Sequence, residues 1–170
     1  HGRHMFRIQR LQYSLQHEIQ AQENNNDKKY GFRDYRGGGR SSGRETIGRV
    51  AAGAVAAKIL EGLGVRVTAY TKAIGNIQVQ PERFDMEECS RNMLYMPDAS
   101  AAAEAQMFLE EKMAQMDSAC GIVECVIQGV PAGIGEPVFE KLDANLAKAI
   151  CSIGAVKGFE IGDGFEAAKT

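Results

Sequence analysis

The residues best suited to bind an anion lie in the stretch 35–46, Tyr-Arg-Gly-Gly-Gly-Arg-Ser-Ser-Gly-Arg-Glu-Thr. Its three consecutive glycines allow positive φ angles and a close approach of the backbone to a ligand. Ser42 has the character of a helix N-cap, and Glu45 three residues later completes a capping box. The first backbone N–H groups of that helix would then face the bound group. Charge for a phosphate or carboxylate would come from Arg36, Arg40 and Arg44.

This stretch matches neither of the common nucleotide-binding fingerprints. A Walker loop needs a Gly-Lys-Ser or Gly-Lys-Thr, and none follows here. A dinucleotide-binding turn follows a strand, and the residues before position 35 lack a clear strand pattern. From these residues alone two interpretations stay open: a specific phosphate site, and an ordinary capped helix behind a glycine turn with solvated arginines.

The length of 170 residues and the composition, with 44% hydrophobic and 25% charged side chains, predict one globular domain. The net charge of −2 offers no general attraction to nucleic acid or to an anionic membrane, so we expect neither as a partner. No apolar run approaches the roughly 20 residues of a membrane span, and we expect a cytoplasmic protein. We expect no metal site, and we expect reduced thiols that mostly fill the core at Cys89, Cys120, Cys125 and Cys151.

Hydrophobic periodicity predicts alternating helices and strands after residue 43. Three stretches have helical spacing, and Val65–Ala73 and Gly121–Val130 alternate as strands do. The segment 75–98 contains two prolines, so we expect an irregular excursion with at most a short helix near 83–92. Strands and helices follow one another without a strict βαβ rhythm, which favours an α+β layered fold. The predicted helices are 43–63, buried on more than one side, 99–116 and 138–153, and a turn-rich strand is predicted at 158–165.

The first 27 residues differ from the rest of the chain. Apolar residues between Phe6 and Gln22 have near-helical spacing in a polar, glutamine-rich background, which indicates an amphipathic arm. The run Glu23–Asp27 indicates a linker, so we expect a boundary near Asp27. Residues 1–5 resemble an added tag. We expect 1–27 to be an N-terminal arm and 28–170 to be the main domain.

Three long motifs resemble the signatures of the chorismate synthase family. The first is residues 29–46, Lys-Tyr-Gly-Phe-Arg-Asp-Tyr-Arg-Gly-Gly-Gly-Arg-Ser-Ser-Gly-Arg-Glu-Thr. The second is Gly-Val-Pro-Ala-Gly-Ile-Gly-Glu-Pro-Val-Phe at 129–139, with Lys-Leu-Asp-Ala at 141–144. The third, at 152–165, is Ser-Ile-Gly-Ala-Val-Lys-Gly-Phe-Glu-Ile-Gly-Asp-Gly-Phe. The resemblance covers roughly Lys28 to the C-terminus and implies a β-α-β sandwich fold and a homotetramer.

The resemblance also implies an activity. Chorismate synthases remove phosphate from 5-enolpyruvylshikimate 3-phosphate in a 1,4 elimination that yields chorismate, the precursor for aromatic amino acid biosynthesis. They require reduced FMN, although the reaction has no net redox change. Carried over by motif, Arg44 would bind the anionic substrate. The FMN contacts would be Arg40, Ser41, Ser42, Gly154 and Ala155.

The chain departs from the family pattern in its histidines. The family's Arg-Pro-Gly-His-Ala-Asp motif is replaced by Gln20–Glu23, and the early Phe-Gly-Glu-Ser-His-Gly motif is absent. The resemblance therefore leaves the catalytic residues of this chain unassigned. We expect a central fragment of roughly half the family's length that is catalytically incomplete alone. The alternative is a non-catalytic structural or interaction module that retains the fold and a phosphate- or flavin-binding loop, with the arm 6–22 as its contact element.

Three further polar residues in or near the second and third motifs have simpler structural interpretations. Glu136 lies beside a proline in a turn, Asp143 belongs to the face of a predicted helix, and Lys157 fits a solvated lysine or a distant positive contact. None of them is expected to act as a general acid or base.

Overall fold

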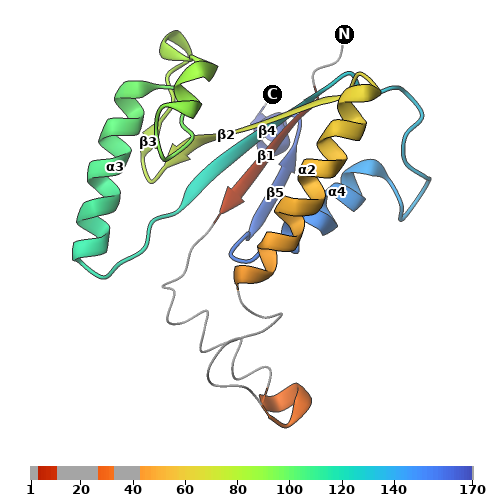
Figure 1. Ribbon diagram of the computed structural model, residues 1–170, viewed down its shortest axis with the longest axis horizontal. Helices are drawn as coiled ribbons and strands as arrows, with labels where there is room; N and C mark the ends of the chain where they lie inside the picture. Colours follow the sequence, from red (N-terminus) through yellow and green to blue (C-terminus); the bar gives the residue numbers. More distant parts are fainter. Residues whose placement is uncertain (1–3, 11–26, 33–42, 170) are drawn as a thin grey trace.

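The computed structural model describes the backbone of residues 4–10 and the structure of residues 27–32 and 43–169. Five strands form one sheet in the order β3-β2-β4-β1-β5, and every neighbouring pair is antiparallel. Helices connect and flank this sheet (Figure 1), so the predicted α+β class is confirmed. The strands are β1 (His4–Arg10), β2 (Arg66–Ile74), β3 (Ile77–Gln78), β4 (Gly121–Gln128) and β5 (Gly158–Ile161).

Strand β1 corrects the prediction of a helical arm in its first part. On one side its residues pair with β4, beginning with His4 opposite Ile127. On the other side they pair with β5, ending with Gln9 opposite Gly158. Phe6 and Ile8 are two positions apart, as on one face of a strand, whereas Ile8 and Leu11 are three apart, as on one face of a helix. In such an ambiguous segment strand pairing decides the structure. The rest of the expected arm, residues 11–22, lies outside the described residues, and the boundary near Asp27 stays a prediction.

In the described part of the chain, three long α-helices accompany the sheet, and residues 27–30 form a short helical turn. The first two lie close to their predicted ranges, but the third begins four residues later than predicted. Val138 has a φ of 67°, in the left-handed region, which a β-branched residue inside an α-helix cannot adopt. The segment before this helix is therefore a turn. The helices are α2 (Thr46–Gly62), α3 (Ala99–Ala114) and α4 (Leu142–Cys151).

The core packs beneath α3. Met96 and Ala105 are fully buried there, and the end of β2 closes the cluster with Ile74. Alanines on one face of α3 let the helix approach closely. This packing unit is called the α3 lobe below. It consists of α3, β3, the end of β2 and the segment 79–98, with partly buried side chains from Ile77, Val79, Leu94, Phe108, Leu109 and Ala119 around its centre.

The excursion between β2 and α3 is irregular, as predicted. It contains two short 3-10 turns, Pro81–Arg83 and Met86–Ser90, of which the second matches the expected short helix. Strand β3 was not predicted because it is only two residues long. Asn92 holds the segment together, since its amide donates to the carbonyls of Glu88 and Met96 and its oxygen accepts from the N–H groups of Leu94 and Met96.

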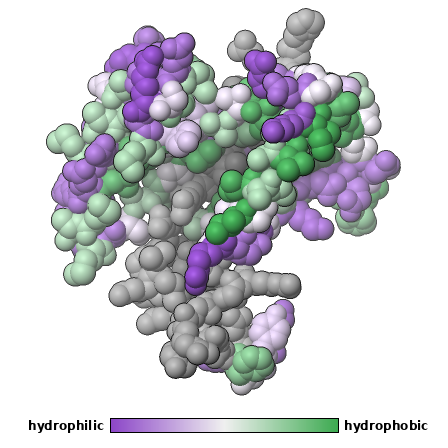
Figure 2. Space-filling view, in the orientation of Figure 1, coloured by the Kyte–Doolittle hydropathy of each residue, from purple (hydrophilic) through white to green (hydrophobic). Residues whose placement is uncertain are grey.

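Helix α2 contradicts the expectation that it is buried on more than one side. None of its residues is buried in the described structure. Figure 2 shows its hydrophobic side chains gathered along the surface of the helix. A helix is buried on more than one side only if other elements pack against more than one of its faces. Among the described elements, the neighbouring strands flank only one side of α2. The exposed apolar residues here are Ile47, Val50, Val55, Ile59 and, just past the helix, Leu63.

Candidate functional site

The described part of the first motif is a 3-10 turn, Gly43–Glu45, that continues directly into α2. Arg44 is exposed on this turn. The Glu45 carboxylate forms an ion pair with Arg49 one helical turn later. The predicted contacts Arg40, Ser41 and Ser42, and with them the capping box, lie outside the described residues.

The third motif begins where α4 ends. The Ser152 hydroxyl donates to the Ala149 carbonyl at 2.6 Å, which closes the last turn of the helix. Ala155 has a φ of 66°, in the left-handed region, which is costly for a residue other than glycine. A Cβ at Gly154 would meet no atom within 4 Å. The fold itself therefore leaves open space over the backbone at Gly154, as close approach of a planar ligand would require.

Arg49 joins these two motifs, which lie 103 positions apart in the sequence. Its Nη2 atom donates to the carbonyl oxygen and to the hydroxyl oxygen of Ser152, both at 3.1 Å. Figure 1 shows α2 and α4 next to each other on the sheet. The structure thus brings the turn that carries Arg44 and the turn that carries Gly154 and Ala155 to one side of the molecule.

The second motif is an exposed turn between β4 and α4. It starts at Gly129, whose φ is 79° and whose backbone passes so close to Gly64 that a Cβ would lie 2.1 Å from the Gly64 carbonyl oxygen. Gly64 ends the turn after α2, so the second motif is held against the end of the helix that the first motif starts. Within the turn, the Glu136 N–H donates to the Glu140 carbonyl at 2.9 Å.

The remaining candidates stay at the periphery. Glu136, Asp143 and Lys157 are exposed, and the Asp143 carboxylate accepts a hydrogen bond from the N–H of the next residue. This placement agrees with their structural interpretations. Within residues 27–32 and 43–169 no group of three His, Cys, Asp or Glu side chains is arranged to hold a metal ion. No described helix combines the length and the apolar character needed to cross a lipid bilayer.

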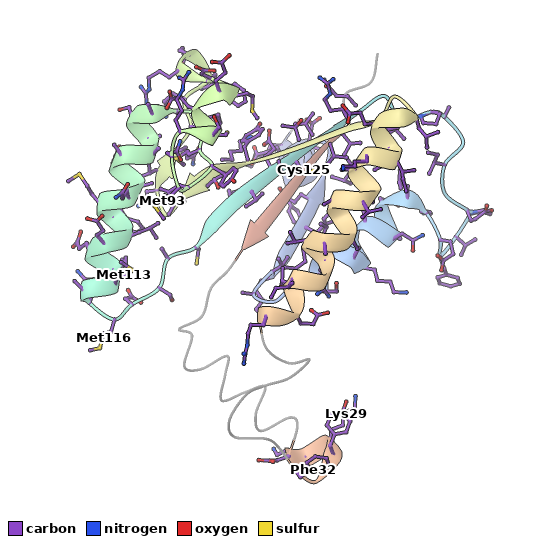
Figure 3. The ribbon with its side chains drawn as sticks, viewed as in Figure 1. Lys29, Phe32, Met93, Met113, Met116 and Cys125 are labelled. Atoms are coloured by element: carbon purple, nitrogen blue, oxygen red, sulfur yellow. The ribbon has the colours of Figure 1, made fainter. Side chains whose placement is uncertain are left out.

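The cysteines fit the core-filling expectation only in part. Cys89 is buried and Cys125, labelled in Figure 3, is half-buried in the sheet, whereas Cys120 and Cys151 are exposed. Burial raises the pKa of the Cys89 and Cys125 thiols. Because the thiolate is the reactive form, neither of these two thiols has the character of a nucleophile.

Sequence reasoning missed two polar clusters. One is Glu45–Arg49–Ser152, for which the only local signal was the spacing of four between Glu45 and Arg49. The other is a buried carboxylate in the sheet: Glu124 is 2% exposed and accepts from Tyr70 and Lys72 on the neighbouring strand β2. Strand alternation placed Glu124 on one face of β4, but its partners follow from the register alone.

The comparisons with known proteins agree with the motifs. The chorismate synthase family model matches residues 22–170. Chorismate synthases of Agathobacter rectalis and Lachnospira eligens are 63% and 64% identical over 143 residues, which is 84% of this chain and 39% of each relative. The chain thus spans well under half the length of these curated relatives.

A solved structure shows the same fold. A crystal structure of chorismate synthase superimposes with a TM-score of 0.77 at 31% identity, and the match covers 87% of this chain and 48% of that one. A family match over most of the chain and a shared fold over most of the described elements point to the same relationship. The chain therefore belongs to the chorismate synthase family.

Proposed function

We propose that this chain carries the flavin- and phosphate-binding part of a chorismate synthase active site. The reaction is the 1,4 elimination of phosphate from 5-enolpyruvylshikimate 3-phosphate to chorismate, in the cytoplasm, on the route to the aromatic amino acids. The observation that carries the proposal is the Arg49–Ser152 contact, which brings the first and third motifs together. A generic anion site would require only the first motif.

The described residues fit FMN and an anionic substrate. The open space over Gly154 and the left-handed backbone at Ala155 would accept a flat ring system. Arg44 is an exposed cation beside the first N–H groups of α2, which favour a bound phosphate or carboxylate. Arg40, Ser41 and Ser42 would complete the flavin contacts. Reduced FMN, when bound, is required for a reaction that has no net redox change.

The residues of this chain would act by binding and by charge stabilisation. In a 1,4 elimination a C–O bond and a C–H bond break, phosphate and a proton leave, and one new double bond forms. Arg44 would hold the anionic substrate and stabilise the charge that develops on the leaving phosphate. The sequence lacks the family's histidine motifs for proton transfer. We therefore expect binding without turnover by this chain alone.

Titration of the full chain with reduced FMN, together with an assay for chorismate, tests this proposal. We expect saturable FMN binding that weakens by about 1.5 to 3 kcal/mol in Arg40→Ala, because a charge-assisted hydrogen bond to phosphate is lost. Arg91→Ala is the matched control, since Arg91 pairs locally with Glu87 and Glu88 in the α3 lobe. No FMN binding would refute the flavin site, and full turnover would refute the claim of incompleteness.

Substrate binding needs a separate measurement. Arg44→Ala should weaken binding of 5-enolpyruvylshikimate 3-phosphate more than binding of FMN if the two ligands use different arginines. Equal loss of both would place Arg44 in a shared anion site instead.

The second candidate is a non-catalytic interaction module, which is favoured by the row of apolar side chains that α2 leaves exposed. Sedimentation of the full chain addresses both this candidate and the family's homotetramer. An oligomer that forms without FMN binding would favour the interaction module, and an FMN-binding tetramer would favour the enzyme.

A further inference from the structure

The end of α4 leaves backbone carbonyls that the helix itself cannot satisfy. Every α-helix ends with such unpaired acceptors, and the negative end of the helix dipole attracts a cation there. Here the N–H groups of Ser152 and Ile153 still donate back into the helix, to Ala149 and Ile150. The Ser152 carbonyl oxygen accepts from Arg49 of α2 at 3.1 Å. The cap of α4 is thus supplied by another helix.

The Arg49 guanidinium is held on two sides. Its Nη1 atom pairs with the Glu45 carboxylate and its Nη2 atom with the two oxygens of Ser152. A planar, forked group can make both contacts at once in a fixed orientation, whereas a lysine ammonium is a single point charge. An ordinary i,i+4 ion pair on a helix surface contributes little to stability. Here the same guanidinium also binds Ser152, which lies 103 positions away in the sequence.

The turn assigned to the flavin begins directly after Ser152. Gly154 and Ala155 lie two and three residues later, and Ala155 adopts the unfavourable left-handed conformation. Such a backbone persists only where its surroundings hold it in place. Within 152–157 Ile153, Ala155 and Val156 are half-buried and the other residues are exposed, so packing covers this turn only in part.

We propose that Arg49 is a positioning residue of the flavin site. It holds the turn 152–155, which would contact FMN, against the turn Gly43–Glu45, which carries the proposed substrate residue Arg44. Arg49 itself does not contact the ligand. This inference rests on the proposed function. Glu45 and Ser152 hold the Arg49 guanidinium in place from its two sides.

Two measurements on the full chain test the role of Arg49. In Arg49→Ala, the dissociation constant for reduced FMN should rise about fivefold to tenfold. Amide hydrogen exchange in 152–157 should become faster without FMN, because the turn has lost its anchor. Arg49→Lys should recover only part of the affinity. Arg91→Ala, at an arginine with two local carboxylate partners, should leave both readouts within about twofold of the unsubstituted chain.

A double-mutant cycle separates the clamp from a general loss of stability. Ser152→Ala removes the hydroxyl acceptor, so combining it with Arg49→Ala should weaken FMN binding by less than the product of the two single effects. The proposal is overturned if Arg49→Ala binds FMN as the unsubstituted chain does. It is also overturned if affinity falls while exchange in 152–157 is unchanged, since that pattern indicates direct contact, or if affinity falls only in step with the melting temperature.

Failure of the proposed function looks different. If the unsubstituted chain does not bind FMN, the flavin site is refuted, while the exchange experiment still reports whether Arg49 anchors the turn.

Discussion

Helix α3 and helix α2 are both rich in alanine, yet they have opposite surroundings. Ala101, Ala102 and Ala105 of α3 are at most 5% exposed, against Met96 and the end of β2. Ile47, Val50 and Ile59 of α2 are 62–69% exposed. The α3 lobe is held by packing, whereas the motif region, meaning α2, α4 and the turns 43–45, 129–141 and 152–157, is held by local clamps. The difference shows that the elements packed against a helix, rather than its amino-acid composition, decide how far its side chains are buried.

The largest expected effect is in the α3 lobe. Met96→Ala should lower the free energy of unfolding by about 3 kcal/mol, because a fully buried side chain leaves a cavity. Met93→Ala is the matched control, since Met93 is 93% exposed (Figure 3), and it should change stability by less than about 0.5 kcal/mol. Urea denaturation measures both. An equally small effect of Met96→Ala would remove the contrast between the two regions.

In the motif region the largest effect should come from the backbone. Gly129→Ala places a Cβ 2.1 Å from the Gly64 carbonyl oxygen at a left-handed φ, and should cost about 2 to 3 kcal/mol. Gly154→Ala adds a Cβ in open space and should change stability by less than about 1 kcal/mol. Thermal unfolding distinguishes them. If both variants unfold alike, the close approach of Gly129 to Gly64 does not anchor this region.

The third effect concerns Asp98, which is fully buried at the start of α3. Its carboxylate caps the helix through the N–H groups of Ser100 and Ala101 and pairs with Arg83 at 3.0 Å. Asp98→Ala should cost about 2 kcal/mol at neutral pH, because the cap and the ion pair are both lost. Asp98→Asn keeps a cap acceptor and should cost less. Equal losses would assign the effect to the charge alone.

Asp98 also predicts a pH dependence. Burial opposes its ionisation, but hydrogen bonds from Arg83 and from two backbone N–H groups outweigh burial and hold its pKa below the ordinary 3.8. The ionised form thus stabilises the fold above that pH, and this stability is lost as the pH falls from about 4 through the lowered pKa. Urea unfolding across this range should show a smaller loss in Asp98→Asn. Identical pH profiles would contradict the linkage.

The smallest effect is expected in the sheet. Tyr70→Phe removes a hydroxyl that donates to the buried Glu124 carboxylate and should cost about 1.5 kcal/mol, since Lys72 still pairs with that carboxylate. The ring and its edge-to-face contact with Phe84 are retained. Tyr95→Phe, at a tyrosine that is 65% exposed, is the control and should be close to neutral. Chemical denaturation that finds the two variants equal would show that the Tyr70 hydroxyl adds no net stability.

The sequence predicted most of the elements because their signals are local. Alternation located β2 and β4, and helical spacing located α2 and α3, within a few residues of their observed ends. Local signals failed where two periods coincide, as in β1, and where a turn precedes a helix, as at Val138. For the site, the three motifs identified the family, but nothing local indicated the contact between Arg49 and Ser152 because the two residues are 103 positions apart.

The sequence by itself determined the order of α2, β2, α3, β4, α4 and β5, the family, and the turns able to approach an anion. Only the tertiary structure decided which faces are covered. On β2 it buries Tyr70 while Val67 on the opposite face stays 48% exposed. It also decided that the N-terminal turn of α2 and the turn 152–155 meet through one guanidinium. The physical reason is that periodicity and capping act over a few residues, whereas burial and a hydrogen bond across 103 positions depend on how the whole sheet assembles.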